Sequence, residues 1–253
     1  MDRSYGWKPD LPDQRDFRFR SVAPPVSGPL PASVDLRPLC PPVQDQGELG
    51  SCTAHAWAGA VGFCEYRDKV KRWDPSRLFI YYNERAIEGT ISQDSGSELR
   101  DGAKALAQYG VCPEPEWPYN TGRFAAKPSK VCFSDAAKRK IQGYYRVNQV
   151  LSDMQGCLAQ GYPFVLGFSV YESFESEAVA QSGIVPMPDQ SDQLLGGHAV
   201  LCVGYDTAKQ LFLVRNSWGT SWGQKGYFWI PFAYLLNSDL SSDFWTLRTG
   251  TGI

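Results

Sequence analysis

The stretch from Gln46 to Cys52, QGELGSC, most constrains the fold of this chain, because it opens a helix-like run with a cysteine. The run that follows is typical of a helix with Ser51 at its N-cap. Cys52 would then lie in the first turn, where unpaired backbone N–H groups and the helix dipole favour negative charge. A low thiol pKa there would supply the reactive thiolate. We therefore predict a helix that presents a nucleophilic cysteine at its start.

The polar partners for such a cysteine lie far along the chain. His198 follows two glycines and begins an apolar run typical of a strand, and Asn216 lies in the motif RNSWG. A histidine beside the thiolate would hold it as an ion pair and protonate the leaving amine. Asn216 would orient that ring, and Trp218 would cover their hydrogen bond from water. The side-chain N–H of Gln46 and the backbone N–H of Cys52 would form an oxyanion hole.

These motifs resemble those of the papain-like cysteine peptidases, in particular prokaryotic members with a short N-terminal extension. The resemblance covers residues 32–245 through VDLR, QDQGELGSC, SGIV, GGHAVLCVGYD and VRNSWGTSWGQKGYF. His198 also falls within the roughly 130–150 residues that separate cysteine and histidine in that family. The resemblance implies a thiol peptidase without a cofactor or a metal ion. It assigns the nucleophile to Cys52, the general acid and base to His198, the orienting role to Asn216 and an oxyanion donor to Gln46.

The chain departs from the family pattern around the nucleophile. The family usually carries a disulfide-bonded cysteine three residues before the nucleophile, where this chain has Leu49. The stretch that normally holds the partner cysteine reads DSGS, from Asp94 onward, so both halves of the bridge are missing together. Thr53 and His55 replace a common tryptophan and phenylalanine. We expect these changes to alter the cleft walls and the substrate preference and to leave the chemistry intact.

His55 is the alternative base, since it is the second of only two histidines. It follows Cys52 by three residues and would share its helix face one turn deeper, which is poor geometry for activating a nucleophile. We therefore expect His55 to be a buried, hydrogen-bonded residue.

By resemblance, the pocket for the residue that precedes the scissile one dominates selectivity and accepts apolar side chains. The predicted substrate-binding residues are Ser97, Gly167, Gly197 and Trp218. The family's occluding loop needs a pair of histidines, and this chain has none to spare. Endopeptidase action is therefore expected rather than removal of dipeptides.

Hydrophobic patterning predicts an α+β fold of two lobes that meet at a cleft. The resemblance implies the papain-like two-lobe fold with the active site in that cleft. Residues 34–140 form a mainly helical lobe with the nucleophile, and residues 141–253 form an antiparallel, barrel-like β lobe with the histidine and asparagine. The expected helices are 52–71, 76–88, 97–109 and 151–160. The expected strands are 141–147, 164–170, 198–205, 211–214 and 227–230.

The first segment, residues 1–33, is rich in proline and charge and reads as an extended loop. A tail of this composition stays ordered only where it docks on something. We expect it to pack on the enzyme body and to occupy or border the cleft as an inhibitor or gate. The alternative is a tail on the back of the molecule.

The charge and the apolar runs of the chain limit which partners it can bind. The net charge is −2 and no long basic run occurs, so nucleic-acid binding is not expected. No stretch reaches the roughly 18–20 apolar residues that span a bilayer. We expect a monomer that acts on proteins or peptides. The resemblance favours a secreted or cell-envelope location, although the given N-terminus lacks an apolar signal core. A catalytically silent binding protein and an acyl transferase with the same triad are the alternatives.

Six cysteines remain besides the nucleophile. Their even number permits disulfide bridges without showing any. Cys40, Cys112 and Cys132 lie in proline-rich or loop contexts and are the better bridge candidates. Cys64 and Cys202 lie in helical and apolar runs and are expected to be buried thiols.

Overall fold

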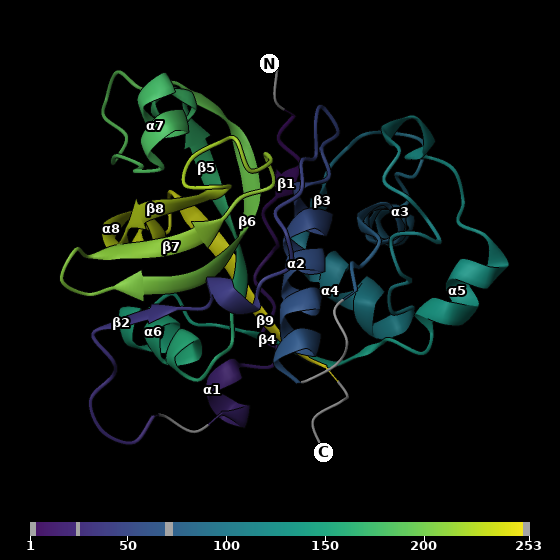
Figure 1. The fold of residues 1–253 in the computed structure, drawn as a ribbon, viewed down its shortest axis with the longest axis horizontal. Coiled ribbons are helices and arrows are strands. Elements are labelled where there is room, and N and C mark those ends of the chain that lie inside the picture. Colours follow the sequence, from purple (N-terminus) through teal and green to yellow (C-terminus); the bar gives the residue numbers. More distant parts are fainter. Residues whose placement is uncertain (1–3, 24–25, 69–72, 250–253) are drawn as a thin grey trace.

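A computed structural model of the chain describes residues 4–23, 26–68 and 73–249. As predicted, the fold is α+β and joins a helical side to an antiparallel sheet (Figure 1). The sheet runs in the order β4 (Ile141–Arg146), β9 (Ser241–Thr249), β5 (Phe164–Tyr171), β6 (Leu194–Asp206), β7 (Leu211–Arg215) and β8 (Tyr227–Pro231), and β2 (Ser33–Asp35) also pairs with β6. Among these described strands β4 and β8 are not paired with each other, so the predicted barrel-like lobe is an open sheet.

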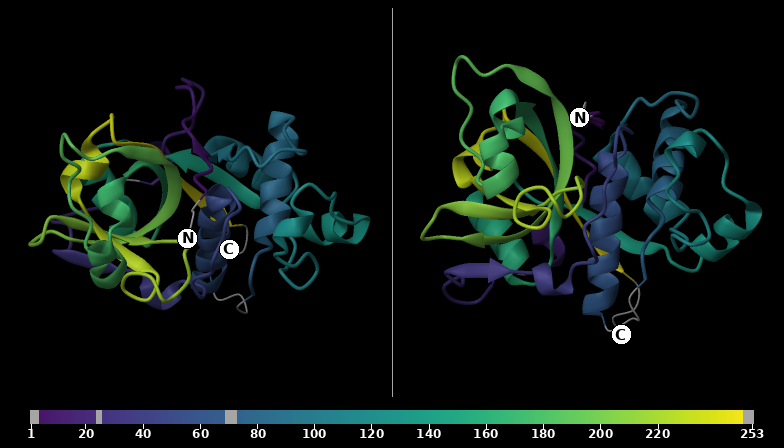
Figure 2. Two further views of the ribbon diagram at one scale, coloured as in Figure 1. Left: turned by 90° about the horizontal axis from the view of Figure 1, so that it is seen from above. Right: turned by 45° about the horizontal axis from the view of Figure 1, so that its top comes forward.

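The helix α2 (Cys52–Arg67) lies between the sheet and the other large helices (Figure 2). Those are α3 (Arg77–Glu88), α4 (Leu99–Gln108) and α5 (Lys130–Ala136), while α6 (Leu151–Ala159) lies on the β side. The short elements are α1 (Phe19–Val22), α7 (Glu177–Ser182), α8 (Phe232–Leu236) and the 3₁₀ turns η1 (Arg37–Leu39), η2 (Thr121–Arg123) and η3 (Glu172–Glu175). None of the described helices is long and apolar enough to cross a membrane.

Helix α2 is buried on every side for most of its length, because it packs on α3 and on the sheet at once. Small residues allow this close approach. A Cβ atom placed on Gly59 would lie 3.2 Å from a methyl group of Leu201 in β6. The predicted helix 52–71 ends at Arg67 in the structure, and residues 69–72 lie outside the described residues.

Two predicted helix starts shift, for identifiable reasons. Ser76 is the N-cap of α3, where its side chain accepts a hydrogen bond from the N–H of Phe79, so the helix begins one residue later. Ser97 and Glu98 form the short strand β3 instead of the first turn of α4. The N–H of Ser97 donates to the carbonyl of Gly6, which draws this residue into strand pairing.

Strand β9 and helix α5 are the longest of the elements that the sequence prediction missed. Strand β9 is buried on both faces, which removes the alternation that marks a half-exposed strand. It is also bent at Asp243, whose φ of 59° is left-handed. Helix α5 has seven residues and follows a proline-bearing loop, so it carries too little periodicity to be recognised.

The core forms two clusters on opposite faces of the sheet. One surrounds α2 and includes Val165, Leu201 and Trp245 from three strands. The other lies on the far face and is built from aromatic residues such as Phe164 and Phe212. Since the first cluster draws side chains from both sides of residue 140, the division into lobes at that position stays a prediction.

The N-terminal segment is more ordered than the predicted loop. It contains β1 (Trp7–Lys8), which pairs in parallel with β3 (Ser97–Glu98), and the single turn α1. Figure 1 shows β1 running between β6 on one side and β3 on the other. The segment therefore passes between the sheet and the helices.

Candidate active site

Cys52 is the first residue of α2 and is fully buried. The N–H of Ala199 in β6 donates to its sulfur at 3.4 Å, so the helix start lies directly against the strand. Ser51 stands at the N-cap position but makes no side-chain cap, contrary to the prediction. Its hydroxyl lies 2.6 Å from that of Tyr119 and 3.3 Å from the Nδ1 atom of His55, and these contacts replace the cap.

His198 and Asn216 are joined as a buried pair. The His198 Nε2 atom lies 2.8 Å from the Asn216 Oδ1 atom. Because the N–H of Ser217 also donates to that oxygen at 2.8 Å, the amide accepts and Nε2 carries the hydrogen. The indole of Trp218 lies 5.1 Å from the imidazole, centroid to centroid, and covers the pair. His198 precedes Ala199 in β6, so one strand brings the ring and the Cys52 contact to the same place.

Gln46 is fully buried and its amide is held at both ends. The carbonyl oxygen accepts from the Ser217 hydroxyl at 2.6 Å. The Nε2 group donates to the carbonyl of Leu49 at 2.9 Å and to the carbonyl of Ser4 at 3.2 Å. The predicted oxyanion donor therefore points at a main-chain carbonyl of the N-terminal segment.

Burial raises the pKa of the Cys52 thiol to about 11. Hydrogen bonds from the backbone of Ala199 and Gly6 partly oppose this rise. The direction is opposite to the lowered pKa that the helix start alone predicts, because the thiol has lost its contact with water. Burial outweighs these hydrogen bonds, one of which comes from Gly6 of the N-terminal segment, so the neutral thiol is favoured.

Of the predicted pocket residues, Gly167 and Gly197 lie against Trp7. A Cβ atom placed on Gly167 would lie 1.9 Å from the Trp7 ring, and one on Gly197 would lie 2.7 Å from it. The side chain of Ser97 is turned elsewhere and donates to Glu88 at 2.5 Å. The two glycines thus form an apolar slot that the tryptophan fills.

Asp243 is a site residue that sequence reasoning missed. Its carboxylate accepts a hydrogen bond from the Trp7 indole at 3.1 Å and one from the N–H of Asp10 at 2.8 Å. Burial, followed by the nearby Asp10 carboxylate, raises the pKa of Asp243 to about 6. The strand around it, SSDFWTLRT, mixes polar and apolar residues, so the sequence carried no local signal for this role.

An ion-pair cluster holds the rest of the segment. Asp10 accepts hydrogen bonds from the Trp245 indole at 2.9 Å and from Arg146 at 3.1 Å. Asp16 pairs with Arg146 at 2.9 Å and with Arg100 at 2.8 Å. Burial raises the pKa of Asp10, and the two hydrogen-bond donors oppose that rise. Residues 4–16 are therefore tied to both β9 and α4.

A hydrogen-bonded carboxylate stands where the family's disulfide is missing. Asp94 accepts from the N–H of Gly50 at 3.1 and 3.0 Å and from the hydroxyl of Tyr81. Leu49, in the usual cysteine position, is buried in the core around α2. The loop before Cys52 is thus joined to the stretch around Asp94 without a covalent bond.

His55 is a buried, hydrogen-bonded residue, as expected. Its Nδ1 atom lies 3.0 Å from the carbonyl of Ser51, and its ring packs edge-on against Tyr119 at 4.9 Å. Burial, followed by the charge of Arg77, lowers the pKa of His55 to about 3. The ring is therefore neutral at physiological pH.

A buried acid lies behind the first turn of α2. Thr53, the second residue of α2, donates from its hydroxyl to Glu84 of α3 at 2.8 Å. Glu84 is fully buried, and that burial raises its pKa to about 8.

Comparisons with known proteins agree with this geometry. The family model described as papain family cysteine protease matches residues 30–235. An uncharacterised peptidase C1-like protein of Acanthamoeba polyphaga mimivirus is 38% identical over 99% of this chain and 88% of its own length. Cysteine proteinase 2 of Entamoeba histolytica is 27% identical to this chain. The match covers 78% of this chain and 62% of that protein.

Among solved structures, xylellain, a cysteine protease from Xylella fastidiosa, is similar with a TM-score of 0.89 and 45% identity. The match covers 99% of this chain and 98% of that one. The digestive procathepsin L 3 of Tenebrio molitor shares the fold, with a TM-score of 0.71 and 21% identity over 97% of this chain and 76% of its own. The chain belongs to the papain family of cysteine proteases.

Proposed function

We propose that Cys52 is the nucleophile of a peptidase whose general acid and base is His198, oriented by Asn216. The 2.8 Å hydrogen bond between His198 and Asn216 carries this proposal. The Cys52 sulfur lies beside this pair, because it contacts Ala199, the residue after His198 in β6. In this arrangement Nε2 keeps its hydrogen toward Asn216, and the other ring nitrogen exchanges the proton of the thiol. That nitrogen then protonates the leaving amine and later activates water to release the acyl-enzyme.

The oxyanion in this proposal is bound by the side chain of Gln46 and the backbone N–H of Cys52. The Gln46 amide has one donor directed to Leu49 and is fixed through Ser217, so it is preorganised. Its contact with the Ser4 carbonyl supports the role, because a main-chain carbonyl is the group that a substrate would present.

We infer endopeptidase action on proteins or peptides. The two histidines lie at His55 and His198, so neither supplies an occluding pair for a free substrate terminus. The slot between Gly167 and Gly197 would bind the residue that precedes the scissile one. Because Trp7 fills that slot and reaches Asp243, we expect the slot to accept aromatic side chains.

We further propose that the N-terminal segment keeps the enzyme as a zymogen by covering the cleft. Ser4 faces the oxyanion donor, Gly6 pairs with Ser97, and Trp7 fills the slot. Residues 1–33 would then act as a gate on the helical part, 34–140, and the β part, 141–253. These contacts support a position in the cleft over one on the back of the molecule.

Hydrolysis of a fluorogenic peptide with an aromatic residue before the scissile one tests the proposal. The assay compares the full chain, a chain beginning at Ala32 and Cys52→Ala, all under reducing conditions. We expect no turnover by Cys52→Ala and a gain on truncation. Activity that survives Cys52→Ala would overturn the assignment of the nucleophile, and equal activity of the two unsubstituted chains would overturn the gate.

A further inference from the structure

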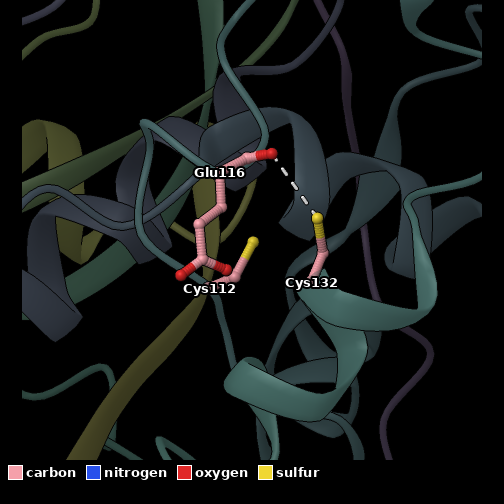
Figure 3. A group of neighbouring side chains, drawn as sticks. All are labelled: Cys112, Glu116 and Cys132. Atoms are coloured by element: carbon pink, nitrogen blue, oxygen red, sulfur yellow. Dashed lines mark hydrogen bonds between the residues drawn. The ribbon is translucent and has the colours of Figure 1, made fainter.

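Cys112, Glu116 and Cys132 gather on the helical side, away from the cleft. Both sulfur atoms and one carboxylate oxygen of Glu116 lie within 4.8 Å of one another (Figure 3). The two cysteines are buried and Glu116 is exposed, so the group lies just below the surface. Cys112 follows α4, and Cys132 is the third residue of α5.

The Cys132 sulfur is held in place by its own neighbours. It lies 3.2 Å from the Ser129 hydroxyl and donates to the carbonyl of Glu116 at 3.5 Å. Ser129 is also the N-cap of α5, since it accepts from the N–H of Cys132. Figure 3 shows the sulfurs of Cys112 and Cys132 turned toward the same space beside Glu116.

We propose that Cys112 and Cys132 form a redox couple that closes into a disulfide by exchange with a low-molecular-weight disulfide such as oxidised glutathione. One protein thiol loses its proton and attacks the small disulfide, which releases one small thiol. The second protein thiol attacks the resulting mixed disulfide and releases the other. Two protein thiols and one small disulfide thus become one protein disulfide and two small thiols, and the sulfur–sulfur bonds balance.

The geometry favours this couple over a metal site. The two sulfurs must close from within 4.8 Å to about 2.05 Å, which is a local movement at the start of a short helix. A structural zinc site commonly takes four protein ligands, and this group offers three, one of them on an exposed side chain. Neither histidine belongs to the group.

The disulfide would close the segment between the two cysteines, residues 113–131, which has only η2 as regular structure before α5. This segment carries Tyr119, whose hydroxyl donates to the carbonyl of Gln46 at 2.9 Å and lies 2.6 Å from that of Ser51. The segment therefore supports both the oxyanion residue and the start of α2 from behind. Oxidation would fix its two ends and limit its excursions.

Peptide mapping of Cys52→Ala tests the proposal, because this variant can neither digest itself nor trap the oxidant at the nucleophile. The protein is incubated with oxidised glutathione, its remaining thiols are blocked, and it is digested with trypsin without reduction. We expect the tryptic peptides 105–123 and 131–138 to be found as one species that separates on reduction. Blocked thiols at both positions, or bridges of either cysteine to another partner, would overturn the proposal.

Thermal unfolding provides the second readout. A disulfide that closes about 20 residues should raise the Tm by roughly 5–10 °C on oxidation. In the same background, Cys112→Ser, Cys132→Ser and Cys132→Ala should each abolish this rise. Cys40→Ser removes a buried cysteine outside the pair and should keep it. A rise that persists without Cys112 or Cys132 would contradict the pairing.

Metal analysis of the purified, reduced protein distinguishes the redox couple from a zinc site. We expect less than one zinc ion for every ten chains. One zinc ion per chain would instead indicate a metal site, under two conditions. Glu116→Gln or Cys132→Ser must remove the zinc, and the bound zinc must protect both thiols from oxidised glutathione. The result is independent of the proposed nucleophile, because the nucleophile is absent from the protein that is tested.

Discussion

The indole N–H of Trp7 donates a hydrogen bond to the carboxylate of Asp243 at 3.1 Å. The contact joins the N-terminal segment to a strand near the other end of the chain. It also places an acidic group at the end of a slot whose walls are Gly167 and Gly197.

Trp7→Ala should weaken the hold of the segment, because it empties the slot and leaves Asp243 without its indole donor. We expect kcat/KM of the full chain toward a short peptide to rise severalfold. Leu11→Ala is the matched control, since that side chain lies in the same segment and is 78% exposed. An equal rise in both variants, or none in Trp7→Ala, would argue against the slot as the anchor.

The segment should bind more tightly as the pH falls from 7 to 5. The pKa of Asp243 is raised to about 6 in the docked state, partly by Asp10 of the segment itself. Undocking removes that neighbour and admits water, so the pKa of Asp243 falls. The docked state therefore binds more protons near pH 6, and lower pH favours it. Arg146 and Arg100 also pair with Asp16 of the segment.

Inhibition of the chain that begins at Ala32 by a synthetic peptide of residues 4–23 measures this effect. The inhibition constant should be lower at pH 5 than at pH 7, and Asp243→Asn should flatten the dependence. Weaker inhibition at pH 5 in the unsubstituted protein would show that other groups control release.

Removal of the proposed base should separate the two histidines. In the form that begins at Ala32, His198→Ala should lower kcat by about 10²–10⁴-fold, because proton transfer is lost. His55→Phe should keep most of the activity, since His55 is neutral and bonded to the backbone of its own helix. A loss in His55→Phe as severe as in His198→Ala would reverse the assignment.

Gln46→Ala should lower kcat by about 10²–10³-fold with little change in KM, as expected for a donor that acts on the developing oxyanion. The substitution also removes the amide that the Ser217 hydroxyl contacts, so circular dichroism must show an unchanged fold. A loss confined to KM would make Gln46 a substrate-binding residue without a role in the transition state.

Glu84 should make the protein less stable as the pH rises. Burial raises its pKa to about 8 in the folded state, above its ordinary value in the unfolded chain. The folded state therefore keeps a proton that the unfolded chain has lost, and stability falls between about pH 4.5 and 8. Glu84→Gln should remove this part of the slope in a Tm series at pH 5 and 8. Glu48→Gln, on an exposed side chain, should keep it.

The sequence predicted the helix and the strand that carry the candidate site. It did not predict the long-range contacts that hold the N-terminal segment against them. The helix after Ser51 and the strand at His198 lie where local patterning places them, and Asn216 meets the histidine through β6 and β7 pairing. Local patterning could not reveal Asp243 as a site residue, because its role depends on a tryptophan at the other end of the chain.

The position of the N-terminal segment was also beyond local patterning. Its composition is that of a loop, and its order comes from partners in β3, β5, β6 and β9. Ser51 illustrates the same limit. Its type and place predict a cap, yet Tyr119, far along the chain, engages its hydroxyl instead.

The contact of Asp94 with Gly50 and Tyr81 has a practical consequence for an enzyme that works with a thiol. Where a disulfide holds the loop before a nucleophilic cysteine, a reductant that restores the oxidised cysteine can also reduce that disulfide. Here the Asp94 carboxylate holds the loop by hydrogen bonds, and reductants do not act on hydrogen bonds to oxygen. The contact that holds the loop before Cys52 therefore survives any reductant that restores an oxidised thiol in the cleft.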